Sequence, residues 1–525
     1  MNKIQQTGGD SLKQKCRDNG PVFGLAFAAG MLVHFPIYAY GLQNPDSIWK
    51  GEENIADWWE YTLGRWGLVL VDWLRGGLNA PVLNAAAAMA LFVLASLILA
   101  DVLQVRSRKA RLLMTLTVIC TPYLSISLTY VYCSIAYAAA FLLAVLSVFA
   151  AMRSASFWKG VLAGAVCLMF SLSIYQSNIG VAAGLSVLAV LLALIKDPAS
   201  LKRQEQMLLR LVVMILAGTG LYYGILQIVL HVMNITLSSY KGASSIGSLQ
   251  ALAQLPHALK NAYADVFRYF FRTDIAANHY GMRIFYGLLI LSAAAAFCRW
   301  TLQQPQKKAV LFAVFLILIL PLGVNAIDLI AVSTRIILLT SGGMVLLIPA
   351  AVALCFLSAA DAGGIRWLAA ASAASAVCLL AGSCLQVNTD TMVMHANQQK
   401  TIQLVNRIYA DLEHQDGFTK DSAVLITGTP ELGSYPDNSR LLEKADLYAK
   451  WGMVWPTYSG SWSDWQAVFH TYAGVDLKVC SQEDYVKITA SQQFQQMPVY
   501  PAAGSIQQIG WVTVVKVSGT DRFTD

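Results

Sequence analysis

The stretch QNPDSIWKGEENIADWWEYTLGRWGLVLVDWLRGGLNAP, residues 43–81, separates the first two strongly apolar segments of the chain. It carries six acidic residues and two arginines: Asp46, Glu52, Glu53, Asp57, Glu60 and Asp72, with Arg65 and Arg75. It also contains five tryptophans, the residue type that gathers at a membrane–water boundary. Carboxylates held at a bilayer surface among interfacial aromatic rings indicate chemistry on a molecule embedded in the membrane.

The composition around this stretch is that of a polytopic membrane protein. Of the 525 residues, 56% are hydrophobic and 13% are charged. Residues 388–525 contain 10 Lys and Arg against 15 Asp and Glu, whereas the rest of the chain has a net charge of +12. The basic residues of that larger part cluster in short loops, which fits the positive-inside rule and argues against binding of nucleic acid.

The apolar segments predict a polytopic α-helical membrane protein with about eleven transmembrane helices. The predicted spans are residues 21–42, 81–103, 112–129, 134–152, two within 160–196, 210–234, 283–299, 309–328, 335–357 and 367–387. The segment 160–196 is too long for one span, so we divide it at its polar stretch, residues 175–178. With a cytoplasmic N-terminus and an odd number of spans, the C-terminus lies outside.

This topology divides the chain into three parts. Residues 1–20 form a cytoplasmic segment, and residues 21–387 form a transmembrane domain with long outer loops at 43–80 and 236–282. Residues 388–525 form an extracytoplasmic α/β domain, in which we expect a helix at 395–415, a strand in SAVLITGTPELG and a closing strand at 511–519. Only Cys384 and Cys480 have positions that would let them meet outside the membrane, and the sequence leaves their pairing open.

The acidic residues of loop 43–80 are the candidates for general base chemistry. Asp46 follows Asn-Pro, a turn that presents its side chain, and would deprotonate or orient a hydroxyl group; the plainer alternative is a solvated carboxylate. Glu52, Glu53, Asp57 and Glu60 fit a short interfacial helix, where most of them would form a solvated face and one could serve as a second acid or a metal ligand. No His, Asp and Glu spacing in the chain makes a recognisable metal site.

Several arginines are candidates for binding a phosphate group, because a guanidinium matches phosphate geometry. They are Arg65, Arg75, Arg335 and, with less support, Arg272 beside Arg268 and Arg283. Arg335 stands in an otherwise apolar setting, where ionisable residues are costly and tend to be functional. The alternative for Arg65 and Arg75 is simple snorkelling to lipid headgroups. Tyr175 and Gln176 would bind a sugar, line a cavity or join two helices by a hydrogen bond.

Taken in order, these features resemble a known family, the bacterial and phage-encoded type II membrane glucosyltransferases that modify O-antigen in lipopolysaccharide and convert serotype. The resemblance rests on an outer-loop acid followed by GRWG (64–67), on LSIYQSNI (172–179), on Arg335, and on VLITGTPELG and PVYPAAGSIQQIGWVTVVKVSG near the C-terminus.

The resemblance implies a glycosyltransferase of the GT-C class in the bacterial inner membrane. Such an enzyme takes a sugar from a polyprenyl-phosphate donor, such as undecaprenyl phosphate glucose, on the outer leaflet and passes it with inversion to a glycan acceptor. The usual base is an acid of the first outer loop, here Asp46, with Arg335 and Arg65 holding the phosphate. The family often has two adjacent acids, whereas Ser47 follows Asp46, so Glu52, Glu53 and Asp57 stay open for the role. A divalent cation as cofactor and the oligomeric state are also left open.

Two other function classes fit the many spans. A transporter or flippase for a lipid-linked saccharide would explain arginines near the lipid, but we see no internal repeat or paired broken helices, and the carboxylates cluster outside the membrane rather than at mid-depth. A receptor with a ligand-binding outer domain would leave most of the spans superfluous. The glycosyltransferase hypothesis accounts for both the outer acids and the arginines.

Overall fold

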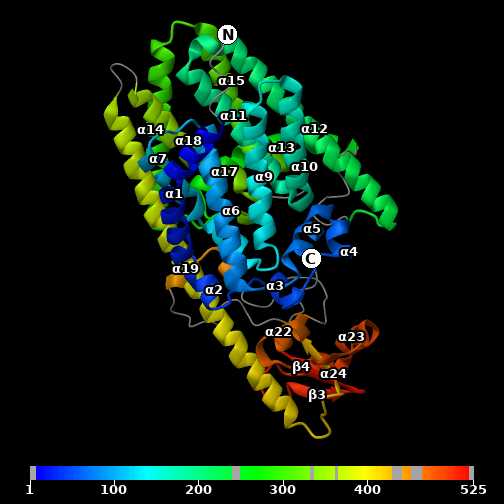
Figure 1. The fold of residues 1–525 in the computed structure, drawn as a ribbon. Helices are drawn as coiled ribbons and strands as arrows, with labels where there is room; N and C mark the ends of the chain where they lie inside the picture. The colour runs from blue at the N-terminus through cyan, green and yellow to red at the C-terminus, as the bar shows by residue number, and fades with distance from the viewer. Residues whose placement is uncertain are drawn as a thin grey trace.

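The computed structural model describes residues 8–238, 249–330, 336–360, 365–428, 440–450 and 464–518. These residues are mostly helical, and long helices form a bundle with a small sheet at one end (Figure 1). The longest helix, α19, runs along the bundle and continues toward the sheet. The short helices of residues 43–81 lie at the end of the bundle that is nearest to the sheet (Figure 1).

Within these ranges, nine helices are long and apolar enough to cross a membrane. They are α6 (Pro81–Val102), α9 (Ser134–Arg153), α10 (Phe157–Ile174), α11 (Ile179–Lys196), α12 (Leu201–Met233), α14 (Met282–Gln303), α15 (Lys307–Val324), α17 with α18 (Gly342–Val345 and Leu347–Ala360) and α19 (Arg366–Glu413).

The first and third predicted spans take other forms. Helices α7 (Arg108–Ile119) and α8 (Pro122–Thr129) meet at a bend of 49° and give a tenth span only if the pair is counted as one. Pro122 causes the bend, because its ring cannot continue the helix that precedes it. In α1 (Gly8–Val33), the apolar part is only Asn19–Val33, shorter than a full span.

The predicted break in residues 160–196 is present. Helix α10 ends at Ile174, Tyr175 is extended, and the 3₁₀ turn η1 (Gln176–Asn178) leads into α11. Helix α10 packs between α9 and α12, and α11 packs against α15. Gly164 permits the first of these contacts, since a Cβ there would lie 2.6 Å from the carbonyl oxygen of Ser147 on α9.

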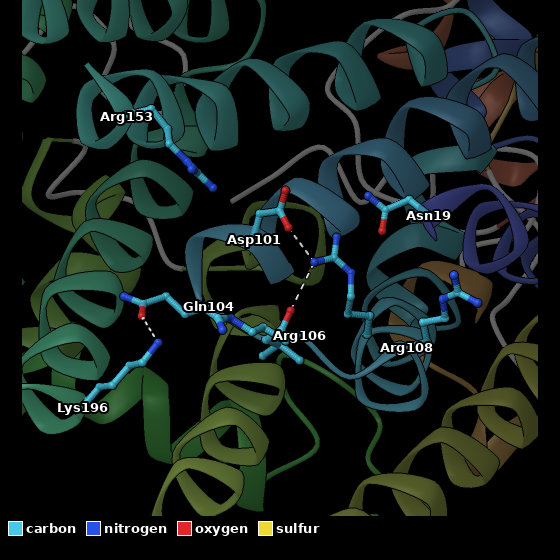
Figure 2. A pocket seen from close by; sticks show the side chains of 9 residues that line it. Asn19, Asp101, Gln104, Arg106, Arg108, Arg153 and Lys196 are labelled. Atoms are coloured by element: carbon cyan, nitrogen blue, oxygen red, sulfur yellow. Dashed lines mark hydrogen bonds and ion pairs between the residues drawn. The ribbon is translucent and has the colours of Figure 1, made fainter. Parts of the chain in front are cut away.

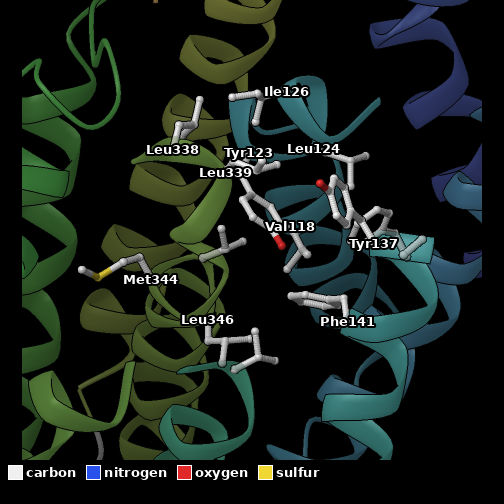
Figure 3. Close-up of a cluster of buried hydrophobic side chains, with 14 of the residues drawn as sticks. Val118, Tyr123, Leu124, Ile126, Tyr137, Phe141, Leu338, Leu339, Met344 and Leu346 are labelled. Carbon is white, nitrogen blue, oxygen red and sulfur yellow. The ribbon is translucent and has the colours of Figure 1, made fainter. Parts of the chain in front are cut away.

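The hydrophobic core of the bundle lies between its helices, near the middle of the part that is predicted to cross the membrane. Figure 3 shows one region of it, in which side chains of α7, α8 and α9 face the segment that begins with η4 (Leu338–Thr340) and α17. The labelled residues are Val118, Tyr123, Leu124, Ile126, Tyr137, Phe141, Leu338, Leu339, Met344 and Leu346. All ten are buried, so this contact closes the bundle beside the bent pair α7 and α8.

Residues 34–81 fold into four short helices. These are α2 (Phe35–Ala39), α3 (Pro45–Lys50), α4 (Trp58–Thr62) and α5 (Trp66–Arg75). Trp58, Trp73 and Leu74 stay exposed, as suits a layer at the membrane boundary. The outer loop predicted at 236–282 contains α13 (Leu249–Phe271), which packs against α14, α15 and α16 (Ala326–Ile330).

The C-terminal region contains a four-stranded sheet in the order β2-β1-β4-β3. The strands are β1 (Ala423–Thr427), β2 (Lys478–Val479), β3 (Ile506–Ile509) and β4 (Val512–Lys516). Strand β1 is parallel to β2 and β4, and β3 is antiparallel to β4. Strands β1 and β4 are the two expected from the sequence, and each is buried along its whole length.

Helix α19 joins this region to the bundle without interruption. It has 48 residues, and the expected helix at 395–415 is its second half rather than a separate element. Residue 388, where composition changes, lies inside it. Cys384 on α19 contacts Cys120, while Cys480 is buried beside the sheet. Cys384 and Cys480 are therefore free thiols and do not pair with each other.

Candidate functional site

Helix α3 carries Asp46 and is fixed to the turn between α8 and α9. Asn44 caps it by accepting a hydrogen bond from the Ser47 N–H at 2.9 Å. The Asn44 N–H and the Ser47 hydroxyl both donate to the Thr129 carbonyl, at 3.1 Å each, and the Val131 N–H donates to Ser47 Oγ at 3.0 Å. Asp46 therefore stands in the first turn of an anchored helix, partly exposed.

Three of the other acids in the loop maintain its shape. Asp57 caps α4, and Glu60 closes the capping box by accepting the Asp57 N–H at 2.9 Å. Glu60 is buried and forms an ion pair of 2.8 Å with Lys50. Asp72 is fully buried and accepts the Ala56 N–H at 2.9 Å.

Arg75 is held in the same loop. It pairs with Asp72 at 3.3 Å and donates to the Asn54 carbonyl at 2.7 Å and to Asn79 Oδ1 at 2.7 Å. A second backbone contact runs to the Leu78 carbonyl at 2.5 Å. Its guanidinium thus joins α5 to the preceding strand-like segment, and these contacts use the donors that a phosphate would need.

Arg65 is placed by a loop that docks on the break between α10 and α11. Gln176 Nε2 donates to the Leu63 carbonyl at 2.8 Å and to Tyr222 Oη at 3.0 Å. The Tyr222 hydroxyl in turn donates to the Gly64 carbonyl at 3.1 Å. Gly64 has φ +74°, and a Cβ there would lie 2.7 Å from Tyr222 Oη. Only glycine fits this turn and this contact together.

The Arg65 guanidinium faces aromatic rings. Its central carbon lies 5.2 Å from the centre of the Tyr175 ring, and its Nε is buried without a hydrogen-bond partner among the described residues. Ring centres are separated by 4.7 Å from Tyr175 to Tyr137, by 5.8 Å from Tyr137 to Tyr130 and by 6.4 Å from Tyr130 to Tyr132. We call these four side chains the tyrosine row.

The tyrosine row connects Arg65 to Asp46. Tyr175 lies against the Arg65 guanidinium, and Tyr132 lies within electrostatic reach of both Arg65 and the Asp46 carboxylate. Residues 46, 65, 132 and 175 are separated in the sequence, and the docking of α3 and of residues 63–67 brings them to one end of the bundle. The result is a carboxylate and a cation that border one aromatic cluster.

A second group of polar residues beside the break was not among the sequence candidates. Helix α16 packs against η1. Within the described part of the chain, three buried side chains here have polar atoms without a hydrogen-bond partner: Asn178 (both amide atoms), Asn325 (Oδ1) and Asp328 (Oδ2). Unpartnered polar atoms in a protein interior are costly and suggest a polar ligand. An acid in the apolar run VNAIDLIAV was the signal that could have identified Asp328.

Nearby on α13, Arg268 belongs to an ion-pair group. It contacts Asp265, which is buried, and bonds Asp274 at 2.6–2.7 Å. Arg272 lies just past the end of α13 and is exposed. Arg335 falls in residues 331–335, outside the described residues.

Of the sequence candidates, Asp46, Arg65, Tyr175 and Gln176 therefore share one region. Glu52 and Glu53 are exposed and lie outside any helix, unlike the short helix predicted for them, because their backbones pair with the segment after α5. Asp57 caps a helix and Arg75 holds the loop together. The described residues contain no group of three or more His, Cys, Asp or Glu side chains that could hold a metal ion.

The C-terminal region also reaches this end of the bundle. Helix α22 (Asp464–Ala473) packs directly against α3, as Figure 1 shows at the lower end of the bundle. On α19, Gln398 Nε2 donates to the Tyr40 carbonyl at 3.1 Å, and the His395 ring stacks on Tyr40 at 4.3 Å. The helix that bears Asp46 thus lies between the bundle and the C-terminal region.

A buried pair of carboxyl groups joins the same parts. Asp390 on α19 accepts hydrogen bonds from the Asp446 N–H at 2.8 Å and from the Tyr448 hydroxyl at 3.1 Å. Asp446 accepts the Ala277 N–H at 3.0 Å. Burial raises the pKa of Asp446 to about 6, although its backbone hydrogen bonds act in the opposite direction.

The chain was compared with known proteins. A family model described as "Glucosyl transferase GtrII" matches residues 52–348, which is more than half of the chain. The searches of curated proteins and of solved structures gave no match. The matched segment contains Arg65, the break at 175–178 and Asp328, whereas Asp46 lies six residues before its start.

The raised pKa of Asp446 predicts how the junction responds to pH. The folded protein binds the proton more tightly than the unfolded chain, so this contribution to stability is complete below pH 3.8 and is lost as the pH rises through about 6. As the pH rises from 4.5 to 7.5, we expect the free energy of unfolding to fall less in Asp446→Asn than in the wild type. The difference between the two decreases should be on the order of 2 kcal/mol. Thermal unfolding of the full chain in neutral detergent measures this. The exposed Asp416→Asn is the matched control; identical pH profiles for all three proteins would contradict the prediction.

Proposed function

The chain belongs to the GtrII glucosyl transferase family, and from this we propose that it moves glucose from a polyprenyl-phosphate carrier to a cell-surface polysaccharide such as O-antigen. The observation that supports this most is the tyrosine row, which lies within electrostatic reach of both Asp46 and Arg65. A transferase acting on a lipid-linked sugar needs a base, a phosphate-binding cation and a surface for the sugar, and these residues provide all three.

Arg65 is proposed to hold the donor phosphate. Its Nε has no partner among the described residues, and the surrounding side chains of Tyr175 and Tyr137 exclude water from one side. A charge-assisted hydrogen bond to a phosphate oxygen is stronger in such a setting than in water. Arg335, from the sequence analysis, would add a second cation to the same role.

The tyrosine row is proposed to position the sugar. Aromatic rings present apolar faces to the C–H groups of a hexose, while their hydroxyl groups can exchange hydrogen bonds with its oxygens. Asn178, Asn325 and Asp328 would bind further hydroxyl groups through the polar atoms that have no partner within the described residues.

The reaction that follows is a single displacement. The acceptor hydroxyl oxygen attacks the anomeric carbon, and the bond from that carbon to the lipid phosphate oxygen breaks. The acceptor proton passes to the Asp46 carboxylate, which acts as general base. The bonding electrons leave with the polyprenyl phosphate, whose negative charge Arg65 stabilises. Attack from the face opposite the phosphate inverts the anomeric centre.

The acceptor is proposed to reach Asp46 from the C-terminal side. Helix α22 packs against α3, so the C-terminal region borders the helix that carries Asp46. We propose a GT-C-like topology of about eleven spans in the bacterial inner membrane. The N-terminus is cytoplasmic, residues 21–387 form the membrane domain, and residues 388–525 form the periplasmic domain. Glu52, Glu53 and Asp57 are exposed and are the alternative bases.

The assignment of the base is tested by replacing Asp46. We expect Asp46→Asn to lower kcat by roughly 100-fold or more, because the amide cannot accept the acceptor proton, while the donor Kd stays near the wild-type value. The measurement is loss of polyprenyl-phosphate glucose in lipid nanodiscs with an O-antigen acceptor, with and without EDTA. Glu53→Gln is the matched control on an exposed acid.

Two outcomes of this assay would require a different conclusion. Full turnover in Asp46→Asn would move the base to another acid, and a loss of turnover in the control would identify Glu53. A wild-type protein that binds the donor but consumes none with any acceptor would favour the flippase.

The phosphate-binding role is tested at Arg65. We expect Arg65→Gln to weaken donor binding by about tenfold or more, because one charge-assisted hydrogen bond to phosphate is lost. Equilibrium binding of the lipid-linked donor to nanodisc-embedded protein measures this. The exposed Arg272→Gln is the control, and a larger loss there than at Arg65 would reverse the assignment.

The docking of residues 63–67 is tested at Gly64. We expect Gly64→Ala to reduce kcat/KM by about tenfold or more, because its Cβ would displace Tyr222 and Gln176 and so misplace Arg65. Gly76→Ala is a matched control, since Gly76 has the same φ of +74° but no atom within 4 Å of its Cβ position. Equal losses in the two variants would show that backbone strain alone is responsible.

A further inference from the structure

A cavity lined largely by basic residues lies among helix ends of the bundle (Figure 2). Its volume is about 390 Å³, and five of its nine lining residues are basic. The lining residues are Asn19, Asp101, Gln104, Val105, Arg106, Arg108, Arg111, Arg153 and Lys196. We refer to it as the basic cavity.

The basic cavity is at the end of the bundle opposite to Asp46. Helix α6 begins at Pro81, next to loop 43–80, and ends at Val102, beside the cavity. With 22 residues, α6 separates the two sites by roughly 33 Å. Arg153 and Lys196 are the last residues of α9 and α11, so the cavity lies level with the ends of apolar helices. Lipid headgroups occupy this depth at a membrane surface.

One charge in the cavity is neutralised internally. Arg111 is buried and pairs with Asp101 at 2.5 Å, and it also donates to the Leu97 carbonyl at 3.1 Å. Its Nε is buried without a hydrogen-bond partner among the described residues. The lining therefore combines a fixed, buried guanidinium with one unused donor.

With five basic residues against Asp101, the lining has a net positive charge. Lys196 donates to Gln104 Oε1 at 2.9 Å, as the dashed line in Figure 2 marks, and Arg153 lies over the Phe149 ring at 5.3 Å. These contacts orient two exposed side chains at the rim of the cavity. Like charges that converge on one concave site repel each other unless an anion is present.

We propose that the basic cavity binds a phosphate group, carried by the headgroup of an anionic phospholipid or by a free phosphate compound. Arginine and lysine together are the usual partners of phosphate oxygens. The positive-inside rule accounts for basic residues at this end of the bundle, but it does not require that five of them line one cavity. The depth of the cavity favours a lipid headgroup. The proposal depends neither on the base nor on the sugar donor.

The test uses the full chain, purified and delipidated in neutral detergent. Short-chain phosphatidylglycerol, phosphatidylcholine and inorganic phosphate are titrated, and bound lipid is counted by native mass spectrometry. We expect phosphatidylglycerol to bind better than phosphatidylcholine. In Arg153→Gln/Lys196→Gln its affinity should fall about tenfold or more, since two cations are removed from exposed positions that do not support the fold.

The matched control is Lys159→Gln/Lys202→Gln, which removes the same charge from exposed residues near the starts of α10 and α12, outside the cavity. Retained phosphatidylglycerol binding in this control, with loss in the cavity variant, supports a lipid headgroup. Binding of inorganic phosphate alone, lost only in the cavity variant, supports the phosphate site with a soluble ligand. Equal losses in both variants would overturn the proposal, and so would a wild type that neither prefers phosphatidylglycerol over phosphatidylcholine nor binds inorganic phosphate.

Discussion

The contact between residues 63–67 and the break in the span at 175–178 is the interaction on which the site depends. The turn between the two spans sets the polar side chain of Gln176 in the packed end of the bundle, where it needs hydrogen-bond partners from the protein. Gln176 and Tyr222 meet this requirement by bonding the carbonyls of Leu63 and Gly64. The same bonds bring Arg65 to the Tyr175 ring. Stability of the break and placement of the cation thus come from one set of hydrogen bonds.

The acidic loop combines buried structural ion pairs with Asp46, the proposed base. Glu60 and Asp72 are buried against Lys50 and Arg75, and a buried carboxylate without such a partner would be strongly destabilising. These pairs make the loop rigid while leaving Asp46 at the surface of an anchored helix. A catalytic carboxylate gains from such rigidity, because its distance to the reacting group is then set before the substrate arrives.

Local signals in the sequence predicted the features that have a local cause. Gln176 interrupts an apolar run, so the break was predictable, and β1 and β4 are short apolar runs bounded by turn residues. The roles of Arg75 and Asp328 depend on partners far along the chain or in the fold, and spacing alone does not reveal them. The sequence therefore does not distinguish Arg75 from Arg65, although of these two only Arg65 keeps a guanidinium N–H donor without a partner among the described residues. Likewise, the change in composition at residue 388 has no counterpart in α19, whose backbone continues.

The continuity of α19 has a mechanical consequence. A helix without a hinge transmits a tilt from one end to the other. The membrane part of α19 and the C-terminal region therefore do not move independently. The last 26 residues of this helix, 388–413, extend roughly 39 Å beyond the apolar part. If α19 tilts by about 10° in the bilayer, its C-terminal end moves sideways by roughly 7 Å. Bilayer thickness, which sets helix tilt, would thereby shift the C-terminal region relative to the proposed site.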